Sequence, residues 1–236
     1  MLACIPRVGV AQIAADRPGF SATATTVDAG HVLVQSGYTL TPSDGVSQHS
    51  IGELDIKIGI INHFEIIAGF NSIRIEKRDD QVESSWDGPT LGLRWRMVER
   101  NPGSTVPTTA VLVRANFPVN GTDKKWIPEA RLVFNWSFAA DFGMNLVVRD
   151  VSSSAGRFTQ WGASAALGSQ LVGRLRWYGE LFILTPQSIE GRDSGTAGGG
   201  LLFLATEALQ FDARVEVGLY GGAPDVAFGF GAAVLF

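Results

Sequence analysis

The stretch that decides the fold is VAFGFGAAVLF, residues 226–236. Its alternate residues form two sets, and a period of two places them on opposite faces of a β-strand. One set is mostly bulky and apolar: Val226, Phe228, Phe230, Ala232, Val234 and Phe236. The other is mostly Gly and Ala: Ala227, Gly229, Gly231, Ala233 and Leu235. Free termini normally lie in water, so a terminal aromatic residue predicts apolar surroundings for this strand.

Composition leaves two classes of protein open. The 236 residues are 45% hydrophobic and 18% charged, and the mean hydropathy of +0.14 is high for a soluble protein. No run of 18 apolar residues occurs, so no helical membrane span is expected. A soluble protein with a large core and a membrane β-barrel remain. The net charge of -4 gives no indication of a nucleic-acid partner, and the single cysteine, Cys4, excludes a disulfide framework and a multi-cysteine metal site.

Alternation of apolar with polar or small residues recurs along the chain after residue 30. A strand of about ten residues is long enough to cross a bilayer at the tilt of a barrel. Twelve such segments are predicted: 31–40, 52–60, 64–73, 88–97, 107–117, 128–138, 142–149, 158–168, 174–184, 196–204, 209–219 and 226–236. The segment 52–60 alternates most cleanly.

The connections separate a membrane barrel from a soluble sheet, which also alternates. Short connections at 61–63, 138–141, 169–173 and 205–208 alternate with longer, more polar ones. The longer ones are 41–51, 74–87, 118–127, 150–157, 185–195 and 220–225. This alternation predicts an all-β fold, a 12-stranded antiparallel up-and-down transmembrane barrel of the bacterial outer membrane. Its short turns and both termini are then periplasmic, and its longer loops extracellular.

Aromatic residues near strand ends also favour a membrane environment. In a membrane barrel they form girdles at the two interfaces. Trp95, Phe138 and Phe236 are the predicted lipid-interface anchors. The partners expected are the lipid bilayer and, through the C-terminal strand ending in Phe236, the barrel-assembly machinery.

The sequence also resembles a family of bacterial outer-membrane β-barrels described as transporters of the meta pathway of phenol degradation. The resemblance covers residues 16–236. It rests on four stretches: DRPGFSATATTVDAGHVLVQSGYTL (16–40), GELDIKIGIINHFEIIAGFN (52–71), GPTLGLRWRM (88–97) and YGGAPDVAFGFGAAVLF (220–236). The opening Asp-Arg-Pro-x-Phe is its most specific part. The resemblance implies an outer-membrane location and a transport role, without naming a solute.

The face opposite the apolar one carries the charged residues predicted to line a pore. The basic ones are Lys57, Arg94, Arg96, Arg114, Arg131, Arg149, Arg174, Arg176 and Arg214. The acidic ones are Glu53, Asp55, Glu65, Glu180, Asp212 and Glu216. Separated basic and acidic walls can select solutes. The alternative is that the charges pair and fill a narrow barrel, because twelve strands lie between a filled barrel of eight and an open one of sixteen.

The N-terminal region divides into two parts ahead of the barrel, which spans 31–236. Residues 1–15 predict the remnant of a secretory signal or a disordered terminus. Residues 16–30 are polar and unpatterned, which suggests a plug in the periplasmic mouth or a loose tail.

Two functions from different classes follow. The first is passive uptake of small solutes through a narrow charged lumen. The second is a structural or adhesive barrel with a filled lumen, which acts through its extracellular loops. An enzyme is not expected, because no Gly-x-Ser-x-Gly occurs and His31, His49 and His63 fall on a strand start, a long loop and a short turn. Neither a cofactor nor a metal is predicted.

Overall fold

The computed structural model describes residues 13, 15–79, 81–117, 119, 126–153, 156–186 and 191–236. The fifteen strands are β1 (Val32–Ser43), β2 (Val46–Ile51), β3 (Leu54–Ile61), β4 (Phe64–Phe70), β5 (Ile73–Arg78), β6 (Gln81–Trp86), β7 (Pro89–Val98), β8 (Thr108–Asn116), β9 (Ile127–Ser137), β10 (Asp141–Ser153), β11 (Gly156–Val172), β12 (Leu175–Leu184), β13 (Ser194–Leu204), β14 (Leu209–Gly221) and β15 (Val226–Leu235). In this part of the chain no helix is long and apolar enough to cross a membrane.

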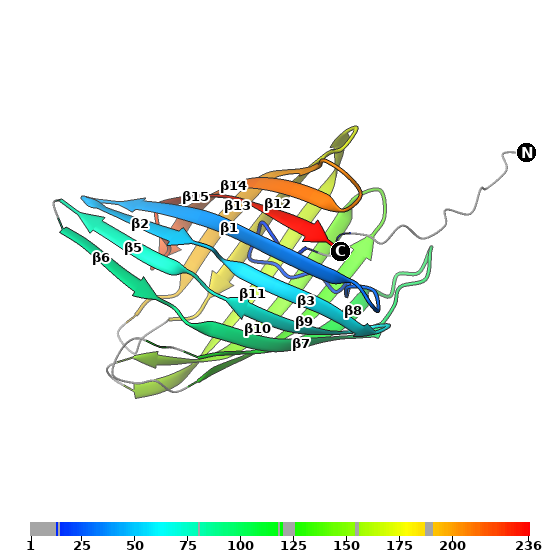
Figure 1. Cartoon of the computed structure of the whole chain (residues 1–236), viewed down its shortest axis with the longest axis horizontal. Coiled ribbons are helices and arrows are strands. Elements are labelled where there is room, and N and C mark those ends of the chain that lie inside the picture. Colours follow the sequence, from blue (N-terminus) through cyan, green and yellow to red (C-terminus); the bar gives the residue numbers. More distant parts are fainter. Residues whose placement is uncertain are drawn as a thin grey trace, which may run out of the picture.

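Twelve of these strands close into a barrel, each antiparallel to its neighbours (Figure 1). The order runs β1, β3, β4, β7 and then β8 to β15. The barrel closes between β15 and β1, where Leu33 pairs with Leu235 and Leu40 with Phe228. This confirms the predicted 12-stranded up-and-down barrel.

The two faces of the wall carry the predicted residues. On β15, Phe228 and Phe230 point outward and are 47% and 60% exposed, whereas Ala227 faces inward and is buried. On β3, Lys57 is fully buried between the outward-facing Ile56 and Ile58. The outer surface is therefore apolar and the interior polar, which suits a barrel whose outer face contacts hydrocarbon.

Three short strands extend one part of the wall beyond the barrel. β2 pairs with the second half of β1, β5 pairs with β2, and β6 pairs with β5. They continue β3, β4 and β7 past brief interruptions at residues 52–53, 71–72 and 87–88. The long loops predicted at 41–51 and 74–87 are thus wrong: these segments are mostly strand.

Two other connections depart from the predicted alternation. β10 and β11 pair as far as Ser153 and Gly156, so the predicted loop 150–157 is replaced by a hairpin. At the end of the barrel that carries the short turns, β7 and β8 are joined by the longer segment 99–107. Loop length is therefore a less reliable signal than alternation, because polar residues also extend strands beyond the apolar belt.

Candidate functional site

Residues 16–27 lie inside the barrel, where the dark blue trace of Figure 1 crosses the lumen, and 28–30 form the exposed turn before β1. Arg17, Ala22, Ala24, Thr26 and Val27 are buried there. The segment has no strand partner, so wall side chains satisfy its backbone. The bonds from its amides to wall side chains run from Asp16 to Gln35, from Phe20 and Ser21 to Glu180, from Ala22 to Asn145, from Ala24 to Asn135 and from Val27 to Glu65.

Asn145 binds the segment as a strand neighbour would. Its Oδ1 accepts a hydrogen bond from the Ala22 amide at 3.0 Å, and its Nδ2 donates to the Ala22 carbonyl at 3.2 Å. Both groups are buried, so the two bonds satisfy polar atoms that would otherwise be costly to remove from water. A primary amide therefore substitutes for a missing strand.

A buried ion cluster holds the beginning of the segment. Asp16 Oδ2 lies 2.6 Å from Lys57 Nζ and also contacts Arg94 Nη2. Arg94 Nη1 lies 3.3 Å from Glu65 Oε1 and donates to the Thr25 carbonyl at 3.1 Å. The side chains of Lys57, Glu65 and Arg94 are 0% exposed. Two acids and two bases thus neutralise one another in the interior, as buried charges require.

The charge of Asp16 gives stability a defined pH dependence. Burial raises the pKa of its carboxyl, but the Arg94 guanidinium and the Lys57 ammonium outweigh burial and hold that pKa well below its usual value. A lowered pKa stabilises the folded protein above the unfolded pKa of about 4. This stability is lost as the pH falls toward the folded pKa.

We therefore expect Asp16→Asn to be destabilised relative to the wild type by an amount that is constant above about pH 5 and shrinks below about pH 4. The measurement is the urea midpoint of the refolded barrel in detergent at a series of pH values. Asp44→Asn is the control, because Asp44 is exposed in the turn after β1. A difference that grows on acidification would contradict the assignment.

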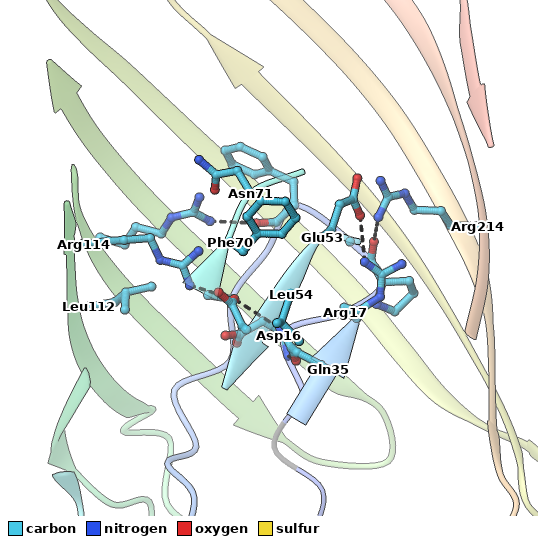
Figure 2. A pocket seen from close by; sticks show the side chains of 16 residues that line it. Asp16, Arg17, Gln35, Glu53, Leu54, Phe70, Asn71, Leu112, Arg114 and Arg214 are labelled. Atoms are coloured by element: carbon cyan, nitrogen blue, oxygen red, sulfur yellow. Dashed lines mark hydrogen bonds and ion pairs between the residues drawn. The ribbon is translucent and has the colours of Figure 1, made fainter. Parts of the chain in front are cut away.

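Arg17 bridges the segment to the closing seam of the barrel. Its Nη1 lies 2.8 Å from Glu53 Oε2 (Figure 2). Its Nη2 lies 3.4 Å from Asp212 Oδ1 and donates to the Phe230 carbonyl. A Cβ at Gly37 would lie 2.1 Å from the Arg17 Cζ, and one at Gly231 2.4 Å from its Nε. The small inner face of 226–236 therefore leaves room for a guanidinium from the segment.

Phe20 is the aromatic anchor of the segment. Its ring stacks on Phe182 at 4.5 Å between centroids, and the Arg131 guanidinium lies 4.8 Å above it. The Arg131 Nη1 also donates to the Phe20 carbonyl at 2.8 Å. Glu180 accepts from the amides of Phe20 and Ser21 at 2.8 and 3.0 Å. Stacking and charge-assisted bonds together fix this turn of the segment against β9 and β12.

Two cavities flank the segment. One of about 190 Å³ lies toward the ends of β3 and β4 that adjoin the extension, and its lining includes Arg17, Glu53, Asn71, Arg114 and Arg214 (Figure 2). The other, of about 220 Å³, lies toward the opposite end, and its lining includes Asn135, Asp141, Arg176, Trp177 and Tyr178. Wall side chains alone therefore leave space in the lumen on both sides of residues 16–30.

The remaining predicted pore residues divide by position. Asp55 pairs with Arg114 at 2.9 Å, Arg131 with Glu129 at 2.7 Å, and Arg214 with Glu216 at 3.0 Å, all on the inner face. Arg149 lies inside on β10, and its Nε donates to Gln160 at 2.6 Å.

Arg96, Arg174 and Arg176 lie near the short-turn end. Arg96 Nε donates to His63 Nδ1 at 2.9 Å, and Arg176 pairs with Asp141. Arg174 is exposed in the turn before β12, where its Nη1 donates to the Ala205 carbonyl.

The three predicted interface residues lie on the outer surface. Trp95, Phe138 and Phe236 are 55%, 64% and 70% exposed. Trp95 sits in register between Phe64 of β4 and Val111 of β8. Arg100 lies over the Phe138 ring at 4.6 Å. All three belong to the end of the barrel that carries the short turns.

Comparisons with known proteins place this geometry among outer-membrane barrels. No family model matches the chain, and no curated protein matches it. An outer-membrane channel from Pseudomonas putida F1 is similar in structure, with a TM-score of 0.63 and 13% identity over 93% of this chain and 99% of the other. The NanC porin is similar with a TM-score of 0.56 and 11% identity, over 86% of this chain and 98% of that one. The chain thus has the fold of bacterial outer-membrane β-barrels.

Proposed function

We propose that this protein is an outer-membrane channel for small solutes, in which residues 16–30 form a plug. The charged inner face, the apolar outer face and the fold shared with two outer-membrane channels support this role. The resemblance to transporters described for the meta pathway of phenol degradation agrees with it. The solute itself is not specified by that resemblance.

The observation that carries the proposal is the space on both sides of one segment. A barrel filled by its own wall would leave no cavities of about 190 and 220 Å³. The lumen between these cavities is occupied by a single stretch of chain, which is covalently continuous with the wall where β1 begins and is otherwise held by side-chain hydrogen bonds and ion pairs. Displacing it would connect the two cavities without rearranging a strand.

The orientation and the domain limits belong to the same proposal. β1 begins and β15 ends at the short-turn end, which is periplasmic in barrels of this type. Residues 16–30 then enter from the periplasm, and 31–236 form the membrane barrel. A secretory leader within 1–15 stays a prediction, because 1–12 and 14 lie outside the described residues.

Contacts with the membrane and with the assembly machinery extend the proposal. Trp95, Phe138 and Phe236 would lie in the periplasmic interface, where aromatic girdles anchor barrels. The barrel-assembly machinery would recognise β15 and Phe236.

A disulfide that reversibly fixes residues 16–30 to the wall tests the proposed channel. The Ser21 Oγ lies 2.8 Å from the Ser164 Oγ of β11, so Ser21→Cys with Ser164→Cys can form a disulfide. Cys4 is replaced by serine to leave one pair. In planar bilayers we expect single-channel steps from the reduced protein, loss of the steps on oxidation, and their return with dithiothreitol.

The single variants Ser21→Cys and Ser164→Cys, oxidised in the same way, are the matched controls and should conduct throughout. Equal steps from the locked and reduced proteins would show that solutes pass without movement of the segment. Silence of every form, including the wild type, would support a structural barrel with a filled lumen.

A further inference from the structure

We propose that Arg114, Arg131 and Arg149 form a binding site for small organic anions on the inner wall, referred to as the arginine site. The site rests on the proposed function, since it lies beside the cavity that a solute would enter from the side of the extension. It assigns to the lumen a preference for carboxylates.

Strand register brings the three guanidiniums around one carboxylate. Arg114 of β8 pairs directly with Glu129 of β9, and Glu129 pairs with Arg149 of β10. Arg131 follows Glu129 by two residues and faces the same way. Adjacent strands lie about 4.8 Å apart, so the two outer arginines stand on either side of Glu129 within reach of one small molecule.

The arginines have more donors than their acceptors use. Glu129 Oε1 accepts a hydrogen bond from the Arg131 Nε at 2.7 Å. Glu129 Oε2 lies 3.8 Å from Arg149 Nη1, beyond hydrogen-bond distance. Within the described residues, the one hydrogen bond donated by Arg149 runs from its Nε to Gln160. No described group accepts from the Arg114 Nε, which is buried. Each guanidinium carries five N–H donors, so several remain available.

Charge favours an anion over a cation at this site. Three guanidiniums face two carboxylates, Glu129 and the Asp55 that pairs with Arg114. Asp55 is reached across β4 and β7, where Gly69 and Gly92 present no side chain. A carboxylate can accept two parallel bonds from a guanidinium, which a neutral solute cannot match.

The arginine site is accessible to solutes from the side of the plug that faces the extension. Arg114 and Arg131 line the cavity of about 190 Å³ together with Phe20 and Leu112. The side chain of Arg149 is 26% exposed. A small anion that enters this cavity would therefore meet the guanidiniums of Arg114 and Arg131 beside residues 16–30.

Equilibrium binding tests the arginine site with succinate as the ligand. The full-length barrel is refolded in detergent and titrated calorimetrically with succinate and, separately, with neutral succinamide. We expect succinate to bind, succinamide not to bind, and Arg114→Gln or Arg149→Gln to weaken succinate by about tenfold or more. Glu129→Gln should instead tighten binding, because it removes the carboxylate that competes for the same donors.

Arg157→Gln is the matched control and should leave the affinity unchanged. It removes the same charge near the same end of the barrel, but Arg157 is exposed and pairs with Asp150. Heat-modifiable gel migration verifies that each variant is folded. The site is disproved if folded Glu129→Gln weakens succinate as the arginine variants do, or if none of the three changes its affinity. Succinate binding by a barrel that shows no single-channel steps would contradict the proposed channel alone. Single-channel steps without succinate binding would contradict the arginine site alone.

Discussion

Arg94→Met is expected to destabilise the barrel by about 3 kcal/mol, at the lower end of the cost of breaking a buried ion pair. The Arg94 side chain is 0% exposed and lies against Glu65, which is equally buried. Without the guanidinium, Glu65 keeps the hydrogen bond from the Val27 amide but loses its nearest cation. Lys57 still faces Asp16, which keeps the cost from being larger.

Urea unfolding in detergent, followed by tryptophan fluorescence, measures the loss. The matched variant is Arg94→Met with Glu65→Gln, which removes both charges and should recover most of the stability. A double variant whose loss is the sum of the two single losses would mean that the two groups do not stabilise each other.

Val215→Arg is expected to cost about 2–4 kcal/mol, the price of a charge at the middle of the outer face of a membrane barrel. Val215 lies near the centre of β14, points outward and is 44% exposed. Leu219→Arg, four residues along on the same face, should cost only about 0–1 kcal/mol, because it lies near the end of the strand.

Unfolding in lipid vesicles, rather than in detergent, measures this depth dependence. The two variants share a strand, a face and an added charge, so each controls for the other. Equal costs at the two positions would be inconsistent with hydrocarbon around the middle of β14.

Much of the fold could be predicted because a strand that contacts hydrocarbon alternates apolar side chains on its outer face with polar or small ones on its inner face. The segment predicted at 226–236 is observed as Val226–Leu235, and that predicted at 52–60 as Leu54–Ile61. Strands that lie outside the apolar belt do not need this alternation. β5 and β6, with the sequences IRIEKR and QVESSW, carry polar groups on both faces, so alternation did not reveal them.

The site was only partly predictable for a related reason. Period two places Arg94, Glu65 and Arg114 on the inner face, because face follows from local geometry. It does not say that Asp16 would reach Lys57, or that Asn135 and Asn145 would bind a backbone. Residues 16–30 have no periodicity, and their partners come from strands far along the chain. A buried asparagine within a strand is the signal that could have pointed to them, since a buried amide needs a partner.

The interruptions at 52–53, 71–72 and 87–88 form a crease across three neighbouring strands. At the crease the outward row is Ile51, Ile73 and Trp86, and two rows beyond it is Ser47, Lys77 and Val82. The outward side chains at the crease are thus all apolar, whereas the row farther out includes a serine and a lysine. The sheet of β2, β5 and β6 therefore projects beyond the barrel wall on one side (Figure 1). In the proposed channel, a solute that approaches along this sheet would meet serine and lysine side chains before it reaches the lumen.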